Sequence, residues 1–277
     1  MSQQKMAVDL VGADLVGIGA WGPAFNNWPE LQALFANPAL GDDLQWATQV
    51  PKPEIIPANE RRRAPLPVRA AVEVSWQALQ QSGLASSEVA CVFGSGLGDT
   101  EITDYMCRVL TTAEKQLSPT KFHNSVHNAA AGYWTISTGC MKSANSIAAY
   151  QNTAGLALLE AMIQCQQHSE PVLVTLFDTA AHDAYRQIFA CEHSFAAALL
   201  LVPAGSASSP IARLALGDEN TAAAVAPQLP CTQLAALYRD NPSAKVLGLL
   251  QQLATKQAGQ ASFALSPARA LNLEVSF

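Results

Sequence analysis

The segment NSIAAYQNTAG, residues 145–155, constrains the fold of this chain more than any other. Its pattern predicts a strand that runs into a tight elbow and then into a long apolar helix. Enzymes that transfer acyl groups place their nucleophile at such an elbow, where helix amides and the helix dipole stabilise negative charge. The elbow residue here is Gln151, whose amide donates and accepts hydrogen bonds but cannot attack a thioester. The segment therefore indicates an acyl-handling fold without its nucleophile.

Apolar strands alternate with helices along most of the chain. We expect strands at 15–22, 88–94, 143–150, 171–180 and 195–204. We expect helices at 29–37, 67–82, 100–116 and 152–167, and a loop with a short helix start and an irregular segment over 118–138. Such alternation predicts an α/β layered fold whose central strands are covered on both faces.

The character of the sequence changes after Ala204. GSASSP resembles a linker, and the tail that follows is rich in alanine, with one expected helix over 244–257 and a final strand over 270–277. We therefore expect a domain over residues 1–204 and a shortened C-terminal segment over 205–277 that packs on it.

Composition narrows the function classes. Of 277 residues, 49% are hydrophobic and only 14% are charged, which indicates apolar surface that a partner covers. The net charge of −6 argues against nucleic-acid binding. The basic run Arg61–Arg63 is too short to change that conclusion, and it predicts a solvated helix start.

The N-terminal 22 residues lack the apolar run of a signal peptide, and no segment is long enough to span a membrane. Six cysteines without a C-x-x-C pair indicate a reduced, cytoplasmic protein.

Two glycine motifs could hold a ligand. Gly17-x-Gly19-x-x-Gly22 matches a dinucleotide fingerprint, but Trp21 crowds the turn and the next helix begins too late to bind a pyrophosphate. The turn over 94–98 lacks the Lys-Ser/Thr pair of a phosphate loop. We predict no cofactor.

Histidine and cysteine offer two further candidates. His123 and His127 lie four residues apart, but their surroundings favour a turn and structural roles, so we predict no metal site. Cys140 is the best candidate for a reactive thiol, yet the sequence shows neither a neighbouring base nor a helix N-terminus that would activate it.

Four features in order resemble the N-terminal half of a β-ketoacyl-acyl carrier protein synthase, which has a thiolase-like fold. They span roughly residues 14–204 and are VGIGAWGP, the run NERRRAP before a helix, VFGSGLGDTE, and the pair NSVHNAAAG with NSIAAYQNTAG. The resemblance implies an α/β/α layered, thiolase-like fold with its N-terminal half complete and its C-terminal half shortened.

The resemblance also implies that catalysis is lost. Active members carry a cysteine where this chain has Gln151, and they use two further basic residues, usually histidines, from the C-terminal half. All histidines here lie at or before His193. Glutamine at the nucleophile position is the mark of chain-length factors, which pair with an active ketosynthase in type II systems. The short length is similar to the chain-length-factor-like subunits of aryl polyene biosynthesis.

Such a subunit implies two surfaces. The strand before the elbow would pair with its counterpart in the ketosynthase, so we expect interface residues at Asn145, Ile147, Ala149 and Tyr150. The acyl tunnel would be lined by residues of the helix after Gly98 and of the following loop. We name Tyr105, Met106, Val109 and Phe122, with Trp134 as a weaker candidate.

The expected partners are an active ketosynthase and acyl carrier protein, with neither nucleic acid nor membrane. Two other functions stay open. The chain could be a stand-alone malonyl-acyl carrier protein decarboxylase or acyltransferase using Gln151 or Cys140. It could also be a scaffold that stabilises the ketosynthase without touching the acyl chain.

Overall fold

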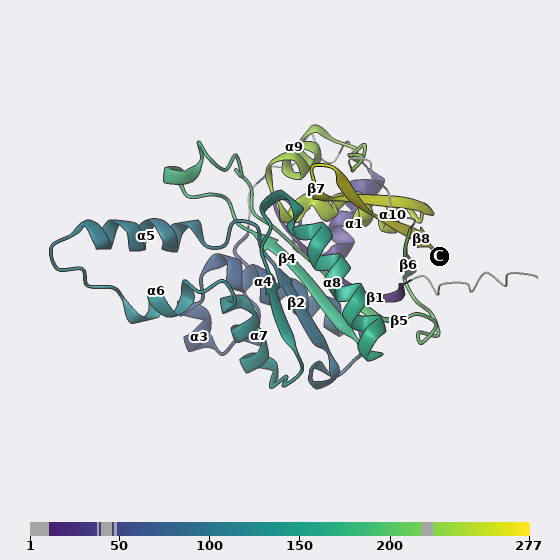
Figure 1. Cartoon of the computed structure of the whole chain (residues 1–277), viewed down its shortest axis with the longest axis horizontal. Helices are drawn as coiled ribbons and strands as arrows, with labels where there is room; N and C mark the ends of the chain where they lie inside the picture. The colour runs from purple at the N-terminus through teal and green to yellow at the C-terminus, as the bar shows by residue number, and fades with distance from the viewer. Residues whose placement is uncertain (1–10, 38, 40–45, 47–48, 218–223) are drawn as a thin grey trace, which may run out of the picture.

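A computed structural model describes residues 11–37, 39, 46, 49–217 and 224–277. In this part of the chain one eight-stranded sheet runs through the molecule in the order β3-β2-β4-β5-β1-β6-β8-β7 (Figure 1). The strands are β1 (Gly12–Trp21), β2 (Ala90–Gly94), β3 (Ala144–Ile147), β4 (Val172–Asp178), β5 (Phe195–Pro203), β6 (Ala212–Leu216), β7 (Gly259–Ser266) and β8 (Arg269–Ser276). Strand β2 is parallel to β3 and β4, whereas β5 is antiparallel to both of its neighbours, β4 and β1. The predicted α/β class is confirmed.

Helices cover both faces of the sheet. One face carries α4 (Leu66–Ser82) and α7 (Ala129–Thr138). The other carries α8 (Thr153–His168), α1 (Trp28–Ala36), α9 (Thr232–Asp240) and α10 (Leu247–Thr255). Short helices complete the order: α3 (Ala58–Arg63), α5 (Thr100–Thr111), α6 (Pro119–Asn124), and the 3₁₀ turns η1 (Ser86–Glu88), η2 (Tyr150–Asn152), η3 (Asp183–Tyr185) and η4 (Ser243–Val246).

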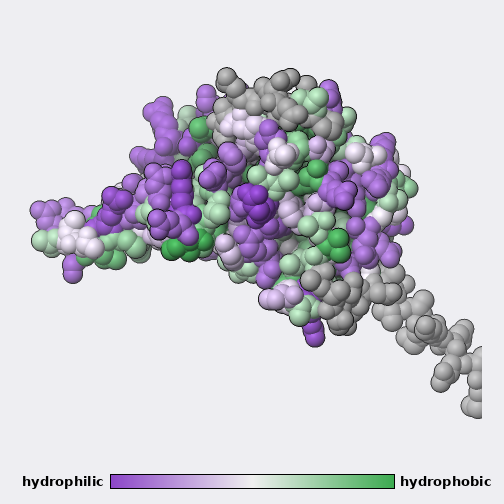
Figure 2. All heavy atoms as spheres, turned by 90° about the horizontal axis from the view of Figure 1, so that it is seen from above, coloured by the Kyte–Doolittle hydropathy of each residue, from purple (hydrophilic) through white to green (hydrophobic). Residues whose placement is uncertain are grey.

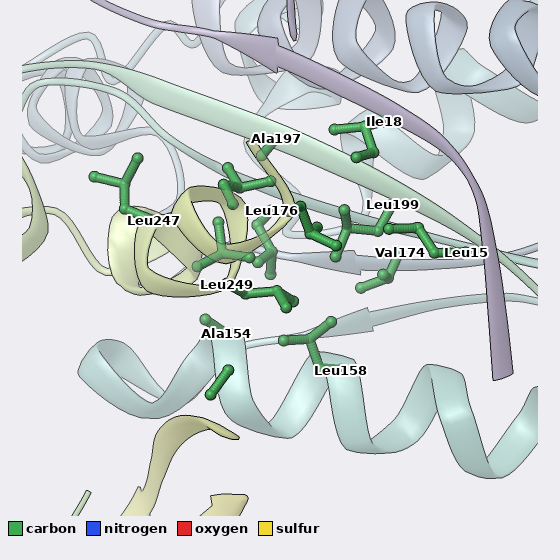
Figure 3. Packing of buried hydrophobic residues seen from close by; sticks show 14 of the residues in the cluster. Leu15, Ile18, Ala154, Leu158, Val174, Leu176, Ala197, Leu199, Leu247 and Leu249 are labelled. Carbon is green, nitrogen blue, oxygen red and sulfur yellow. The ribbon is translucent and has the colours of Figure 1, made fainter. Parts of the chain in front are cut away.

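The apolar faces of the strands interdigitate with the helices. Figure 3 shows side chains of β1, β4 and β5 meeting side chains of α8 and α10, among them Val174, Leu158 and Leu249, all fully buried. Burial of this kind is worth about 25 cal/mol per Å² of apolar surface and is the main term that holds the layers together. The long apolar strands of the sequence therefore form the centre of the sheet.

Two glycines of the dinucleotide-like motif have a packing role. A Cβ on Gly17 would lie 2.0 Å from the Ala78 carbonyl oxygen, and one on Gly19 would lie 2.0 Å from the Val74 carbonyl oxygen. Both glycines therefore let α4 lie directly against β1. They account for the motif without a nucleotide.

The C-terminal segment extends the same sheet. Strand β6 pairs with β1, β8 pairs with β6, and β7 pairs with β8, all antiparallel. Strand β7 also lies over the start of α8, because a Cβ on Gly155 would stand 2.9 Å from the Ala264 carbonyl oxygen. The hairpin β7–β8 thus covers the helix that follows the elbow.

The connection from β5 to β6 is fixed by one buried carboxylate. Asp14 on β1 is 0% exposed and accepts hydrogen bonds from Gly205 N (2.8 Å) and Ala207 N (3.3 Å). Its other oxygen pairs with Arg213 Nε at 2.9 Å. The segment GSASSP, expected to be a linker, therefore contains a fixed turn.

Several sequence expectations need correction. Residues 118–138 are mostly helical, because Ser118 caps α6 and alanines begin α7. Helix α5 ends at Thr111 rather than near 116, where the Thr111 and Thr112 hydroxyls donate to the preceding turn. Elements β6, β7 and α9 were not expected.

Residues 1–10, part of the N-terminal stretch in which a signal peptide was considered, lie outside the described residues. No helix in the described part of the chain has the length and apolarity to cross a membrane.

Candidate functional site

The elbow lies between β3 and α8 and is built mostly by backbone. Tyr150 adopts a left-handed conformation with φ of 48°, which costs a non-glycine residue roughly 1 kcal/mol. The buried Thr153 hydroxyl donates to the Tyr150 carbonyl oxygen (2.8 Å) and accepts from Ala149 N (2.9 Å). A Cβ on Gly96 would lie 2.7 Å from the same carbonyl oxygen, so only glycine fits beneath the elbow.

Gln151 occupies the middle of this elbow, in η2. Its Oε1 atom is buried, and no hydrogen-bond partner for it lies within the described residues. The start of α8 is held by Thr153 instead. The Gln151 oxygen is therefore an unused hydrogen-bond acceptor in the middle of the elbow.

A buried polar network fixes the turn beneath the elbow. Asp178, at the end of β4, is 0% exposed, and each of its oxygens accepts from one backbone amide: Leu97 N at 2.8 Å and Gly96 N at 3.1 Å. Ser95 Oγ (2.9 Å) and Ser243 Oγ (2.6 Å) also donate to it. Burial raises the pKa of Asp178, and these four hydrogen bonds offset part of that rise.

The network joins parts of the chain that are far apart in sequence. Ser243 belongs to η4 in the C-terminal segment, and Asn241 Nδ2 beside it donates to the carbonyl oxygens of Asp178 (3.0 Å) and His193 (2.9 Å). Ser95 accepts from Gly98 N at 2.9 Å, directly before α5. The C-terminal segment therefore helps to position the turn from which α5 begins.

Helices α5 and α6 form an arm that projects from the body of the molecule (Figure 1). The arm is held together by Tyr105, whose hydroxyl accepts from Ser118 N at 3.0 Å and whose ring lies 3.9 Å from Lys121 Nζ. Met106 and Val109 on α5 are half-buried, and Phe122 on α6 is 57% exposed. The structure thus brings all four expected tunnel residues onto one arm. Trp134, the weaker candidate, lies on α7 and is 0% exposed, packed in the core between that helix and the sheet.

Strand β3 forms one edge of the sheet. In the described part of the chain it pairs with β2 alone. Asn145 is exposed on this strand and donates to Glu160 Oε1 at 3.1 Å, and Ile147 is half-buried. The strand ends at Ile147, so the expected interface residues Ala149 and Tyr150 lie beyond it, in the elbow.

Exposed apolar side chains gather on the elements around this edge. Figure 2 shows hydrophobic residues along one edge of the arm beneath a hydrophilic surface. On the arm, the elbow, α7 and the loops beside them, the large exposed hydrophobic residues are Leu110, Phe122, Val126, Ile136, Met141, Tyr150 and Ile188. Ile136 is 81% exposed and Met141 is 94% exposed. Apolar surface gathered in this way is typical of an interaction site.

Cys140 and the histidines do not form a catalytic group. Cys140 is 3% exposed, and its thiol donates to the Val89 carbonyl oxygen at 3.3 Å. His127 contacts the Ser95 carbonyl oxygen at 3.2 Å, while the His123 ring meets the Tyr133 ring. His123 lies in α6 and His127 lies in the turn that follows, so the two do not share one helical face. Among the described residues no cluster of three or more His, Cys, Asp or Glu side chains could hold a metal ion.

Sequence reasoning missed Asp178 and Ser243. A signal for Asp178 was present, since it is a carboxyl group at the end of a run of seven residues that are otherwise apolar or uncharged. Its two amide partners belong to the glycine turn over 94–98, which explains that turn without a phosphate. Ser243 carried no comparable signal, because its role depends on how the tail folds back.

Comparison with solved structures establishes the fold. The chain is similar to a chain of the complex between the ketosynthase ApeO and its chain length factor ApeC from Xenorhabdus doucetiae (TM-score 0.70, 20% identity, covering 95% of this chain and 98% of that chain). It is also similar to the ishigamide ketosynthase/chain length factor (TM-score 0.70, 14% identity, covering 95% of this chain and 98% of that chain). A third similar structure is AntDE:AntF, a type II polyketide acyl carrier protein in complex with its ketosynthase (TM-score 0.74, 11% identity, covering 96% of this chain and 99% of that chain). A search of curated protein sequences gives no match.

These likenesses assign the thiolase-like fold of ketosynthases. At 277 residues the chain is shorter than a full ketosynthase. The family model described as the beta-ketoacyl synthase N-terminal domain matches residues 36–266, which is most of the sequence. The chain therefore belongs to the beta-ketoacyl synthase family.

Proposed function

We propose that this chain is a non-catalytic, chain-length-factor-like subunit of a β-ketoacyl-acyl carrier protein synthase. The observation that carries the proposal is Gln151, which occupies the elbow where a nucleophile would stand. Neither Cys140 nor a histidine replaces that nucleophile, because Cys140 is buried and hydrogen-bonded elsewhere. The proposed role is to pair with an active ketosynthase in type II fatty acid or polyketide synthesis, in particular of aryl polyenes.

The edge strand β3 supports heterodimer formation. Its outer edge leaves backbone amides and carbonyls without a strand partner in the described part of the chain. Exposed edges of this kind pair with strands of other chains. Pairing there would continue the sheet across two subunits, with Asn145 and Ile147 on the paired strand and Ala149 and Tyr150 beside it. The exposed apolar side chains around the edge would be buried at the same time.

The arm supports a role in shaping the acyl tunnel. It projects from the body, and in the proposed complex its residues Tyr105, Met106, Val109 and Phe122 would reach into the bound subunit. In a close-packed tunnel a bulky side chain limits the length of the acyl chain that fits. Acyl carrier protein is the expected second partner, in line with the AntDE:AntF complex of a similar structure. All six cysteines are free thiols, which supports the cytoplasm as the site of function.

Co-purification with a candidate full-length ketosynthase, followed by mass determination, tests the proposal. We expect a stable complex of one copy of each chain, and elongation by the complex but by neither chain alone. A homodimer that ignores the ketosynthase would contradict the proposal. It would favour the decarboxylase alternative, for which the unpartnered Gln151 Oε1 is the supporting observation. Loss of malonyl decarboxylation in Gln151→Ala would then be the result to look for.

Tunnel variants separate a chain-length role from a pure scaffold role. We expect Met106→Ala and Phe122→Ala, each in complex with the ketosynthase, to shift products towards longer chains by about one extension unit, because each removes a large side chain and leaves space. Product lengths measured by mass spectrometry check this. Val225→Ala, on an exposed apolar residue outside the arm, is the control and should leave the distribution unchanged. An unchanged distribution in both arm variants would favour the scaffold.

A further inference from the structure

A cavity at the base of the arm has a surplus of positive charge. Its volume is about 530 Å³, and it lies between the start of α4, the start of α5, α6 and the loop after β4. The charged groups that line it are Arg62, Arg63, Arg69, Lys121, Asp99 and Glu101, together with His182. Four permanent cations thus face two carboxyl groups.

The cations are not neutralised by the chain itself. Among the ion pairs of the described residues, none involves Arg62, Arg63, Arg69 or Lys121. Asp99 caps α5 by accepting from Ile102 N at 2.9 Å; burial raises its pKa, and the charge of Lys121 offsets part of that rise. His182 Nε2 lies 3.9 Å from Asp104 Oδ2. The cavity therefore keeps uncompensated positive charge.

Two buried polar atoms of the cavity wall lack partners. Arg69 Nε is buried, and no hydrogen-bond acceptor for it lies in the described part of the chain. Burial lowers the pKa of Arg69, which shows that its charge is held in an unfavourable place. Asn124 is 4% exposed, donates from Nδ2 to the Arg63 carbonyl oxygen (3.0 Å), and leaves Oδ1 buried without a partner. Such atoms are rare in native proteins and require an explanation.

The start of α4 adds a third feature. This helix has 17 residues, begins at Leu66, and is preceded by Pro65, which offers no side-chain cap. Pro65, Leu66 and Pro67 line the same cavity. The N-terminus of an uncapped helix carries partial positive charge, which favours an anion. Among the helix residues at this end of the cavity, Leu66 supplies a backbone amide, whereas Pro67 has none.

We propose that this cavity binds a phosphate group, with Arg69 and Lys121 as its principal ligands. Arginine and helix amides match phosphate oxygens in geometry and charge. The unpartnered Asn124 Oδ1 would accept a hydrogen bond from a hydroxyl or amide N–H next to the phosphate, so the site fits a small phosphate ester better than a bare ion. The inference does not depend on the proposed heterodimer, because every residue it uses lies in this chain.

Calorimetric titration of the full chain with inorganic phosphate, glycerol 3-phosphate and glycerol, at constant ionic strength, tests the site. We expect saturable binding of both phosphates and none of glycerol. Tighter binding of glycerol 3-phosphate would support a phosphate ester as the ligand. Equal binding of the two would support a site for the phosphate group alone. No saturable binding of either would overturn the proposal, whether or not a ketosynthase complex forms.

Three variants make the test specific. Arg69→Gln is expected to weaken phosphate binding about tenfold or more, since it removes a charged fork at the cavity wall. Lys121→Gln, on an exposed residue whose ammonium group also lies over the Tyr105 ring, is expected to weaken it several-fold. Arg269→Gln, an exposed residue outside the cavity, is the matched control and should bind as the unaltered chain does. Equal binding by all three variants, or an equal loss in all three, would overturn the assignment.

Discussion

Replacing Asp178 by asparagine is expected to lower the free energy of unfolding by about 3 to 5 kcal/mol. Each carboxylate oxygen accepts from a backbone amide, Leu97 N on one side and Gly96 N on the other. An asparagine side chain has one oxygen and one NH₂ group, so one of these amides would face another donor in a buried site. Urea denaturation of the variant and the unaltered chain at neutral pH measures the loss.

Two further variants calibrate that result. Ser243→Ala removes a single hydroxyl donor from Asp178, and we expect a loss of about 1 to 2 kcal/mol. Asp183→Asn makes the same chemical change at a side chain that is 82% exposed, and should lie within about 1 kcal/mol of the unaltered chain. A loss for Asp178→Asn no larger than that of Asp183→Asn would show that the network is not needed for stability.

Alkaline pH is expected to destabilise the chain by about 2 to 4 kcal/mol between pH 8 and pH 10. Burial raises the pKa of Cys91, Cys165 and Cys191 to about 12, whereas unfolded thiols titrate near 9. Above pH 9 the unfolded chain therefore loses protons that the folded chain keeps, and rising pH favours unfolding. Lys245 acts in the opposite direction, because burial lowers its pKa to about 8, but it is one group against three.

Denaturant unfolding at the two pH values checks this, and single variants assign it. Cys165→Ala should reduce the alkaline loss by about 1.4 kcal/mol, the contribution of one thiol over this interval. Lys245→Met should increase the loss, since it removes the opposing group. The readout is the difference between pH values, so a constant loss from the cavity left by Cys165→Ala does not affect it. A stability that is flat or rises from pH 8 to pH 10 would show that the thiols are not protected by burial.

The part of the fold that could be predicted from sequence is the part that is buried on both faces. The strands that became β1, β4 and β5 are long apolar runs, which only the centre of a layered sheet accommodates. Strand β7, with the sequence GQASFALS, and helix α9 bury one side only, so their weaker patterns were not recognised. Their formation depends on elements distant in sequence or irregular in pattern, α8 beneath β7 and η4 beside α9, and a local pattern does not contain that information.

The candidate site, too, could be predicted from the sequence only in part. Gln151 and its place in an elbow followed from a local pattern of strand, turn and helix. The unpartnered Oε1 did not follow, because hydrogen bonding in the elbow depends on how Thr153 and Gly96 are placed around it. The cavity at the base of the arm was equally hidden. Its cations come from α3, α4 and α6, and the run Arg61–Arg63 alone resembled an ordinary solvated helix.

The elbow contains one strained residue, Tyr150, whose backbone is in the left-handed conformation. In an enzyme, strain beside a nucleophile is retained because the chemistry needs it. This elbow has no nucleophile, yet the strained residue is a tyrosine, although glycine would adopt the same conformation freely. Its ring is 43% exposed and lies 5.7 Å from the Phe189 ring, between the edge strand and the loop before β5. The ring contact and the strained backbone thus fix the shape of the elbow beside the edge strand, which is the surface that a second subunit would meet under the proposed function.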